Sequence, residues 1–396
     1  MYGAQLIEAL RRRAAIPARV VTGLGPVQAG QGLATTQALQ LEFFGAGGER
    51  MRVAGCEIVV DAKDLAVVGI TEVLNRLPKI LGLYRKLLRA ADERRPAMAI
   101  VIDAPAFNWR VARQMRKRGI PVVYYVCPQF WAWRQGRVKL LRKYANKALV
   151  IFPFEEKFYR DRGVDATFVG HPLADLPAPA ISREAYAAEN RLDPAKPWIT
   201  LMPGSRRKEV GMNLPTMLEA AGRLGNGYEF LLPVARTLDA SFLAELIAAP
   251  TETSRTASLQ GNIHLVPEAL PALYHSRAGI VASGTATVEA ALMGTPFVMV
   301  YRVSRLTYAL GKPRVKVPYF AMVNLIAEEE VVPELVQHKF TAENIVAEMN
   351  RIIPDGEPRT RMIGRLAMVK ARLKQGRGGG EHPSELAAEI ILKMIG

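Results

Sequence analysis

One short stretch in the second half of the chain combines hydroxyl, glycine and acidic residues: Ser283, Gly284, Thr285, Thr287 and Glu289. An apolar run precedes it and a helical pattern begins within it, so the chain turns there from a strand into a helix. The N-terminus of such a helix offers unpaired N–H groups and a positive dipole end to an anion such as phosphate. Gly284 allows close approach, and the Glu289 carboxylate can bind the two hydroxyls of a ribose. Capping hydroxyls and a solvent-facing Glu289 are the alternative.

A second turn with similar chemistry, Pro203 to Glu209, follows the apolar run Trp198 to Met202. Ser205 supplies a hydroxyl and Arg206 a guanidinium, which can bind two oxygens of a diphosphate at once. Two anion-binding turns at the same edge of one parallel sheet are stronger evidence for a ligand site than either turn alone. Together they predict a diphosphate site.

An acidic residue, Asp103, ends the apolar run Met98 to Ile102 in the first half of the chain. A strand that delivers its chain to the carboxyl edge of a sheet places such a carboxylate well for general-base work. Aspartate is also a common residue at a helix N-terminus, and that reading stays open beside the catalytic one.

These turns need parallel sheets to hold them, and apolar runs of strand length recur along the chain. In the first half they are Leu41 to Phe44, Met98 to Ile102, Pro121 to Val126, Lys147 to Phe152 and Thr167 to Gly170; in the second, Trp198 to Met202, Tyr228 to Leu232, Asn262 to Val266, Gly279 to Ala282 and Phe297 to Tyr301. We therefore predict an α/β fold of two Rossmann-like domains facing each other across a cleft, residues 1–173 and 174–396, joined by a proline-rich linker. Residues 2–14 form a helix pattern with no strand before it.

Composition narrows the function classes. The chain has 396 residues, of which 49% are hydrophobic, so two domains with ample cores are expected. Two cysteines exclude a disulfide framework or a cysteine-rich metal site. A net charge of +16 calls for a polyanionic partner: nucleic acid, an anionic membrane surface or phosphorylated substrates. No familiar nucleic-acid-binding spacing is present, so nucleic acid is not the expected partner.

The segment from Asp64 to Arg95 is apolar around most of a helix but is interrupted by charges, and its uncharged run is too short to span a bilayer. Lysines and arginines flank the apolar face, which is typical of a helix lying in the headgroup region of an anionic membrane. An ordinary buried helix is the alternative. The candidate membrane and acyl-chain contacts are Leu65, Val67, Val68, Ile70, Val73, Leu74 and Leu77.

Taken together, the motifs resemble the lipid-A-disaccharide synthase family, inverting glycosyltransferases of family 19 with a GT-B fold. The matching motifs run in family order over nearly the whole chain: FFGAGGERM (43–51), LAVVGITEVL (65–74), DAPAFN (103–108), YYVCPQFWAWRQGRV (124–138), FPFE (152–155), FVGHPL (168–173), LMPGSRRKEV (201–210), SGTATVEA (283–290), YRVSRLTY (301–308) and VVPELVQ (331–337). Each motif is weak alone, but the set is specific.

The resemblance implies transfer of a 2,3-diacylglucosamine unit from its UDP-linked form to 2,3-diacylglucosamine 1-phosphate, giving a β-1,6-linked disaccharide and UDP. Asp103 then corresponds to the base that takes the proton of the acceptor hydroxyl. The donor-side residues implied are Ser205, Arg206, Ser283, Gly284, Thr285, Glu289 and Asn324. Helix ends and an arginine can stabilise a leaving diphosphate without a metal ion, and the chain has no Asp-x-Asp motif, so no metal and no cofactor are expected.

The resemblance also favours docking of the helix within residues 64–95 on the cytoplasmic face of the inner membrane, with the two lipid substrates and the anionic membrane surface as partners. It leaves room for a homodimer. The basic surface then suits anionic lipid and substrate phosphate rather than nucleic acid.

The departures from the family pattern are informative. Family members begin with a strand and a Gly-Glu-x-Ser-Gly-Asp turn just before the helix that matches residues 2–10, and we expect the reading frame to extend upstream of Met1 by about 20 residues. Residues 25–37 look like an insertion. Ala106 stands where the family often has a second aspartate, which leaves Asp103 as the only carboxylate of its motif.

Two other functions compete. A GT-B-like UDP-N-acetylglucosamine 2-epimerase would share the fold and the nucleotide site, but it has no need of the apolar and basic helix. A non-catalytic basic protein that binds membrane or nucleic acid would need no Asp103. Assays with acylated and unacylated donors separate the first, and Asp103→Asn separates the second.

Overall fold

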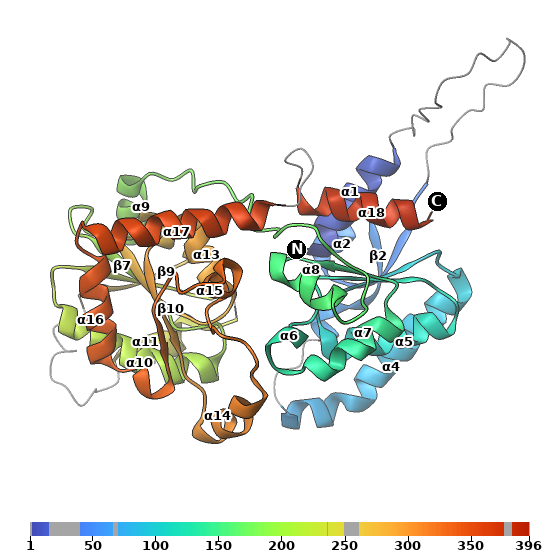
Figure 1. Ribbon diagram of the computed structural model, residues 1–396, viewed down its shortest axis with the longest axis horizontal. Helices are drawn as coiled ribbons and strands as arrows, with labels where there is room; N and C mark the ends of the chain where they lie inside the picture. The colour runs from blue at the N-terminus through green and yellow to red at the C-terminus, as the bar shows by residue number, and fades with distance from the viewer. Residues whose placement is uncertain are drawn as a thin grey trace, which may run out of the picture.

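The computed structural model describes residues 2–15, 40–65, 70–235, 237–248, 261–375 and 382–395. Two α/β domains lie side by side, each with parallel strands and with helices packed around them (Figure 1). The residue 25–37 insertion lies outside the described residues. The α/β fold class predicted from the apolar runs is confirmed.

The second domain is built on one six-stranded parallel sheet of order β12-β11-β10-β7-β8-β9. Its strands are β7 (Trp198–Met202), β8 (Glu229–Pro233), β9 (Ile263–Val266), β10 (Ala278–Ala282), β11 (Phe297–Tyr301) and β12 (Glu334–Val336). The central strands are buried on both faces, which is why they read as continuous apolar runs rather than alternating ones. Sequence reasoning found each strand except β12.

The first domain holds its strands in two sheets. β1 (Phe43–Gly47) pairs with β2 (Cys56–Asp61), and the other sheet has the order β3 (Ala99–Ile102), β4 (Val122–Tyr125), β5 (Lys147–Val150) and β6 (Ala166–Phe168). Sequence reasoning missed β2, although the β-branched run Ile58 to Val60 between Gly55 and Asp61 is a usable strand signal. The chain from Tyr2 to Ala14 is helix α1, as expected.

Helices connect the strands. In the first domain they are α2 (Glu49–Val53), α3 (Ala62–Leu65), α4 (Ile70–Arg94), α5 (Pro105–Lys117), α6 (Phe130–Trp133), η1 (Gln135–Arg137), α7 (Val138–Tyr144) and α8 (Pro153–Arg160). In the second they are α9 (Arg183–Asn190), α10 (Arg207–Leu224), α11 (Ala240–Ala248), α12 (Ala269–His275), α13 (Thr285–Met293), α14 (Arg305–Gly311), η3 (Lys312–Arg314), α15 (Met322–Ala327), η4 (Gln337–Lys339), α16 (Ala342–Ile352) and α17 (Glu357–Lys374). α18 (Pro383–Ile395) closes the chain.

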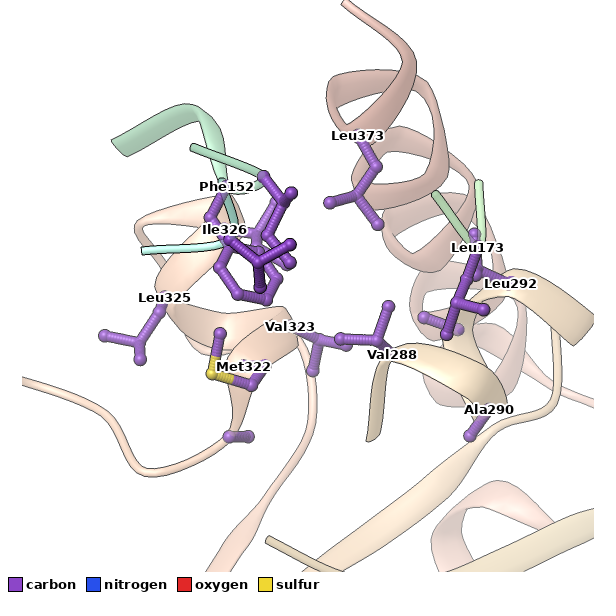
Figure 2. Packing of buried hydrophobic residues seen from close by; sticks show 14 of the residues in the cluster. Phe152, Leu173, Val288, Ala290, Leu292, Met322, Val323, Leu325, Ile326 and Leu373 are labelled. Atoms are coloured by element: carbon purple, nitrogen blue, oxygen red, sulfur yellow. The ribbon is translucent and has the colours of Figure 1, made fainter. Parts of the chain in front are cut away.

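A hydrophobic cluster continues from one domain into the other. Figure 2 shows Phe152 and Leu173 of the first domain in the same cluster as Val288, Val323 and Ile326 of helices α13 and α15. The His171 N–H donates to the Leu373 carbonyl of α17 (3.2 Å), so a backbone hydrogen bond also crosses this junction. Burial of these apolar side chains fixes how the two sheets face each other.

The last helix returns to the first domain. α18 packs along α1, and Arg12 and Arg13 both form ion pairs with Glu385. The sequence had left the position of this helix open, and the domain boundaries predicted from it had grouped residues 382–395 with the second domain. Packing on α1 ties the two ends of the chain together on the outside of the first domain (Figure 1).

The candidate membrane helix is only partly described. Val67 and Val68 lie outside the described residues, and for Leu65, Ile70, Val73, Leu74 and Leu77 only the helical backbone is described. The middle of α4 exposes Leu81 near Arg85 and Lys86, and Lys79 forms an ion pair with Asp64. Within the described ranges, no helix combines the length and the apolar character that crossing a bilayer demands.

Candidate active site

The two anion-binding turns predicted from the sequence start from neighbouring strands. β7 pairs directly with β10, and Met202 lies opposite Val281 in the register. From this pair the sheet grows in opposite directions, through β8 and β9 on one side and β11 and β12 on the other. Such a point, where the strand order reverses, leaves room for a ligand beyond the carboxyl ends of the strands.

The first turn runs from Pro203 to Arg206 and feeds α10. Gly204 has a φ of +123°, a conformation that side-chain-bearing residues rarely adopt. The Asn213 amide donates to the Pro203 carbonyl (2.9 Å) and so ties the turn to the second turn of α10. Ser205 and Arg206 are both exposed there, at the helix N-terminus. Exposed N–H groups and a guanidinium at one point suit a diphosphate.

A carboxylate already touches this turn. The Ser205 N–H donates to Glu209 Oε2 (3.4 Å), and a Cβ on Gly204 would lie 2.4 Å from the Glu209 carboxyl carbon. Burial raises the pKa of Glu209, while the Ser205 N–H and the charge of Arg206 act in the opposite direction. Glu209 belongs to the motif seen in the sequence, but no role had been predicted for it. Its carboxylate accepts an N–H group of this turn, the kind of donor that binds anions at a helix N-terminus.

The second turn, Ser283 and Gly284, feeds α13. Gly284 has a φ of +136° and precedes Thr285, the first residue of the helix. Ser283 donates its hydroxyl to the Phe320 carbonyl (2.8 Å), and the Thr287 hydroxyl donates to the Gly284 carbonyl (2.8 Å). These two hydroxyls therefore shape the turn, and the exposed Thr285 and the helix N–H groups are left to meet a ligand.

Glu289 lies one turn into α13 and is half-buried. Burial raises the pKa of its carboxyl group. Within the described part of the chain, no hydrogen-bond donor or cation pairs with this carboxylate. A half-buried acid with an open hydrogen-bonding capacity is suited to accept two hydroxyl donors from a ligand.

Asn324 lies inside the fold rather than on the ligand side of it. Its side chain is fully buried; the amide group donates to the Val332 carbonyl and to Glu334 (2.9 Å each), and the amide oxygen accepts the Val331 and Val332 N–H groups. With each of these groups in use, Asn324 can position the site but cannot touch a ligand in this conformation.

Glu334 extends this internal network to the turn after β10. Its carboxylate accepts the N–H groups of Phe320 (2.9 Å) and Ala321 (2.8 Å), and the Phe320 carbonyl is the acceptor for Ser283. The acid, the buried amide and the serine therefore form one chain of hydrogen bonds. No periodicity in the sequence marks such a chain.

On the first domain, the turn after β3 has an unusual backbone. Asp103 and Ala104 have φ angles of +48° and +41°, although neither is glycine. Left-handed backbone costs roughly 1–2 kcal/mol for each L-residue. Asn108 donates to the Ile102 (2.7 Å) and Asp103 (2.8 Å) carbonyls, and the Tyr124 hydroxyl donates to the Asp103 carbonyl (2.8 Å). These bonds hold the strained turn with the Asp103 side chain exposed.

Tyr2 connects the acidic residue of the first domain with that of the second. The pKa of its phenol is raised by burial and further by the negative charges of Asp103 and Glu289. The phenol thus responds to one carboxylate of each domain. Its ring packs against that of Tyr125 at the end of β4, with centroids 6.4 Å apart. Sequence reasoning had placed Tyr2 only in a helix.

Beneath the first-domain turn, Glu155 is fully buried. It accepts the Trp131 indole N–H (2.9 Å) and the N–H groups of Ile151 (3.2 Å) and Phe152 (3.1 Å). Burial raises its pKa to about 7. Glu155 lies three residues after Phe152, the residue that precedes α8. A glutamate at this spacing is a helix-capping signal that is visible in the sequence. Trp131 is thus core, whereas Trp133 is 46% exposed.

Comparison with known proteins identifies relatives over almost the full length. A family profile described as lipid-A-disaccharide synthetase matches residues 29–385. A lipid-A-disaccharide synthase from Koribacter versatilis (strain Ellin345) is 49% identical over 395 residues, which span 100% of this chain and 95% of the relative.

Solved structures of low sequence identity share the fold. The glycotransferase of kitacinnamycin matches with a TM-score of 0.59 at 15% identity, over 99% of this chain and 95% of that one. A UDP-GlcNAc 2-epimerase from Neisseria meningitidis bound to UDP-GlcNAc matches with a TM-score of 0.52 at 11% identity, over 87% of each chain. These matches confirm the GT-B fold. Because a transferase and an epimerase both share it, the fold alone does not choose between the two activities.

Proposed function

Because the chain belongs to the lipid-A-disaccharide synthase family and is a glycosyltransferase of lipid A biosynthesis, we propose that it joins UDP-2,3-diacylglucosamine to 2,3-diacylglucosamine 1-phosphate. The products are the β-1,6-linked disaccharide 1-phosphate and UDP. The observation that carries this proposal is the pair of glycine turns at the strand reversal of the second domain, together with an exposed aspartate, Asp103, where β3 of the first domain ends.

In the proposed reaction, Asp103 accepts the proton of the acceptor 6-hydroxyl as its oxygen attacks the anomeric carbon. The new C–O bond forms on one face of the sugar while the bond to UDP breaks on the other, so the configuration inverts. A base and a leaving-group site on separate, facing domains suit this geometry, because the two must lie on opposite sides of the reacting carbon.

The electron pair of the broken bond leaves with UDP, and negative charge grows on its diphosphate. Arg206, Ser205 and Thr285, with the N–H groups after Gly204 and Gly284, are the groups we assign to that charge. Donors that are already in place before the reaction need no reorganisation while the charge develops. Glu289 accepts the ribose hydroxyls, and Ser283 and Asn324 keep the second turn in shape.

We also propose that α4 lies on an anionic membrane, from which the acylated substrates enter. Support comes from the middle of the helix, where the exposed Leu81 lies near the exposed Arg85 and Lys86. Cations on an apolar helix face bind anionic headgroups while the apolar side chains enter the interface. The docked face is expected on the cytoplasmic side of the inner membrane, where UDP-sugars are available.

The test is incubation of the purified protein with both lipid substrates in detergent, with UDP release as the readout. UDP should appear only when donor and acceptor are both present, together with a disaccharide product. The matched control replaces the donor with UDP-N-acetylglucosamine, which lacks acyl chains and should give far slower release. Interconversion of the unacylated donor without an acceptor would instead establish an epimerase.

A further inference from the structure

The segment from Arg305 to Lys316 of the second domain, which we call the basic segment, is unlike the rest of that domain's surface. It comprises α14, η3 and the two residues after them, and no acidic residue occurs from position 302 to position 327. Arg305, Lys312 and Lys316 are exposed. Within the described ranges, no carboxylate pairs with any of these three cations.

Elsewhere on the same domain, several exposed cations have acidic partners. Arg207 pairs with Asp239, Arg351 with Glu348 and Arg361 with Glu357. Charge pairing on a surface reduces its net field, whereas three unpaired cations without a nearby acid add their fields. The basic segment is thus a local source of positive potential and not a typical solvated surface.

The basic segment adjoins an exposed aromatic residue of the first domain. The Lys316 N–H donates to the Ala132 carbonyl of α6 (3.0 Å), and the next residue of α6 is Trp133. The Arg134 guanidinium stacks on the Trp133 ring, 3.8 Å from its centroid. Exposed tryptophan beside arginine and lysine is the composition found at membrane–water interfaces, where the indole enters the headgroup layer.

This surface lies at the same edge of the molecule as the candidate membrane helix. In Figure 1, α14 forms the lower end of the second domain and α4 runs along the lower edge of the first, while α6 lies between them and higher in the view. Each domain therefore presents a basic element at this edge of the molecule. Contact through both domains would also fix how the two sheets are presented to substrates within a bilayer.

We propose that the basic segment and Trp133 form a second membrane contact, which binds an anionic lipid bilayer and anchors the second domain independently of α4. This inference rests on the proposed function only in that a lipid substrate must be reached from a bilayer. Three cations near an anionic bilayer strengthen binding by roughly fivefold each. The tryptophan adds an apolar component that salt does not screen.

The test is flotation of the full chain with phosphatidylcholine vesicles, with and without phosphatidylglycerol. The combined variant Arg305→Ala, Lys312→Ala and Lys316→Ala should bind phosphatidylglycerol vesicles at least about tenfold more weakly at low salt. The difference should vanish at high salt. Lys339→Ala, Arg351→Ala and Arg361→Ala remove the same charge from exposed positions on the same domain and should leave binding near wild type.

Trp133→Ala should weaken binding to both kinds of vesicle at every salt concentration. Equal losses in the two triple variants would overturn the inference, because net charge alone would then explain binding. The inference would also be overturned if the basic-segment variant bound vesicles like wild type but bound RNA more weakly than wild type. The segment would then be a nucleic-acid-binding surface. Transfer between detergent-dispersed substrates should be unchanged in the basic-segment variant, so a failed transferase assay counts against the proposed function and not against this contact.

Discussion

The two edges that face each other in this protein are built on opposite principles. On the second domain, both turns contain glycine at positive φ, Gly204 and Gly284, and the groups that we propose for the diphosphate are largely backbone N–H groups. On the first domain, the same kind of backbone is imposed on Asp103 and Ala104, which carry side chains. Binding a diphosphate needs close approach of the backbone, whereas proton transfer needs a carboxyl group. Glycine serves the first purpose and is useless for the second.

The comparison also explains where the supporting hydrogen bonds lie. A glycine turn adopts its conformation at little cost, so the side chains around it, Asn213 at the first turn and Ser283 and Thr287 at the second, orient the turn and do not have to offset strain. The Asp103 turn is strained and is held by Asn108 and Tyr124 through the carbonyls on either side of it. We expect substitutions on the first domain to change turnover and those on the second to change nucleotide affinity. The predictions below break or sharpen that division.

Asp103→Asn should have the largest effect. It keeps the size and backbone of the residue but removes the proton acceptor, so kcat should fall by about 10²–10⁴-fold. UDP affinity should be within about twofold of wild type, because the groups that we propose for UDP lie on the other domain. Steady-state kinetics and calorimetry with UDP measure the two quantities. A variant with near-normal kcat would remove Asp103 from the mechanism.

Arg206→Ala is the counterpart on the second domain. Loss of the guanidinium should weaken UDP binding and also slow transfer, with kcat/KM for the donor falling by about 100-fold. Lys208→Ala, on an exposed neighbouring position, is the matched control and should stay within about threefold. If Arg206→Ala lowered kcat while UDP affinity was unchanged, the division between the two edges would be wrong.

The positions of the turns could be predicted from the sequence, and the exceptions have physical reasons. Apolar runs that end in Gly, Ser or Asp mark where parallel strands deliver their turns, and the structure places Asp103, Ser205 and Ser283 in such turns after β3, β7 and β10. Contacts between elements leave no periodic trace. Hence Asn324 was expected at the donor, although burial and four hydrogen bonds place it in a supporting role.

The supporting residues of the first domain were missed for the same reason. Asn108 was visible as part of a motif, but its bonds to two carbonyls depend on how α5 returns over the end of β3. Tyr124 lies in an apolar run, where a buried ring is the ordinary expectation. Its hydroxyl donates to the Asp103 carbonyl at the end of the neighbouring strand β3, and only the structure shows this contact. Family resemblance names such residues but does not say what they hold.

Asn108→Ala should have an intermediate effect. Without its two hydrogen bonds the Asp103 turn can relax, and a displaced base should lower kcat by about tenfold or more while UDP affinity is unchanged. Tyr124→Phe removes one hydrogen bond to the Asp103 carbonyl and should lower kcat by a smaller factor than Asn108→Ala. If Tm fell in both variants but kcat did not, these residues would stabilise the fold without positioning the base.

Glu209→Gln should have the smallest effect and the opposite sign. Removing a negative charge from the Ser205 turn should tighten UDP binding about two- to fivefold at low salt and neutral pH. Burial raises the pKa of Glu209, so its carboxyl group begins to take up a proton at a higher pH than an exposed glutamate would. The advantage of the variant over wild type should therefore shrink as the pH falls towards that pKa, because both side chains are then neutral. Taking the ratio of the two affinities cancels the titration of UDP itself.

Glu219→Gln, on the same helix but away from the turn, is the matched control and should not change UDP affinity at any pH. Weaker binding by Glu209→Gln would mean that the carboxylate holds the turn in its binding shape. The second domain would then also depend on a side chain to position its backbone, and the contrast between the two edges would be one of degree. If Glu209→Gln instead bound UDP more tightly than wild type, and if this advantage disappeared at low pH, Glu209 would act as an internal anion. UDP would then displace its carboxylate from a turn that already has the shape needed for binding.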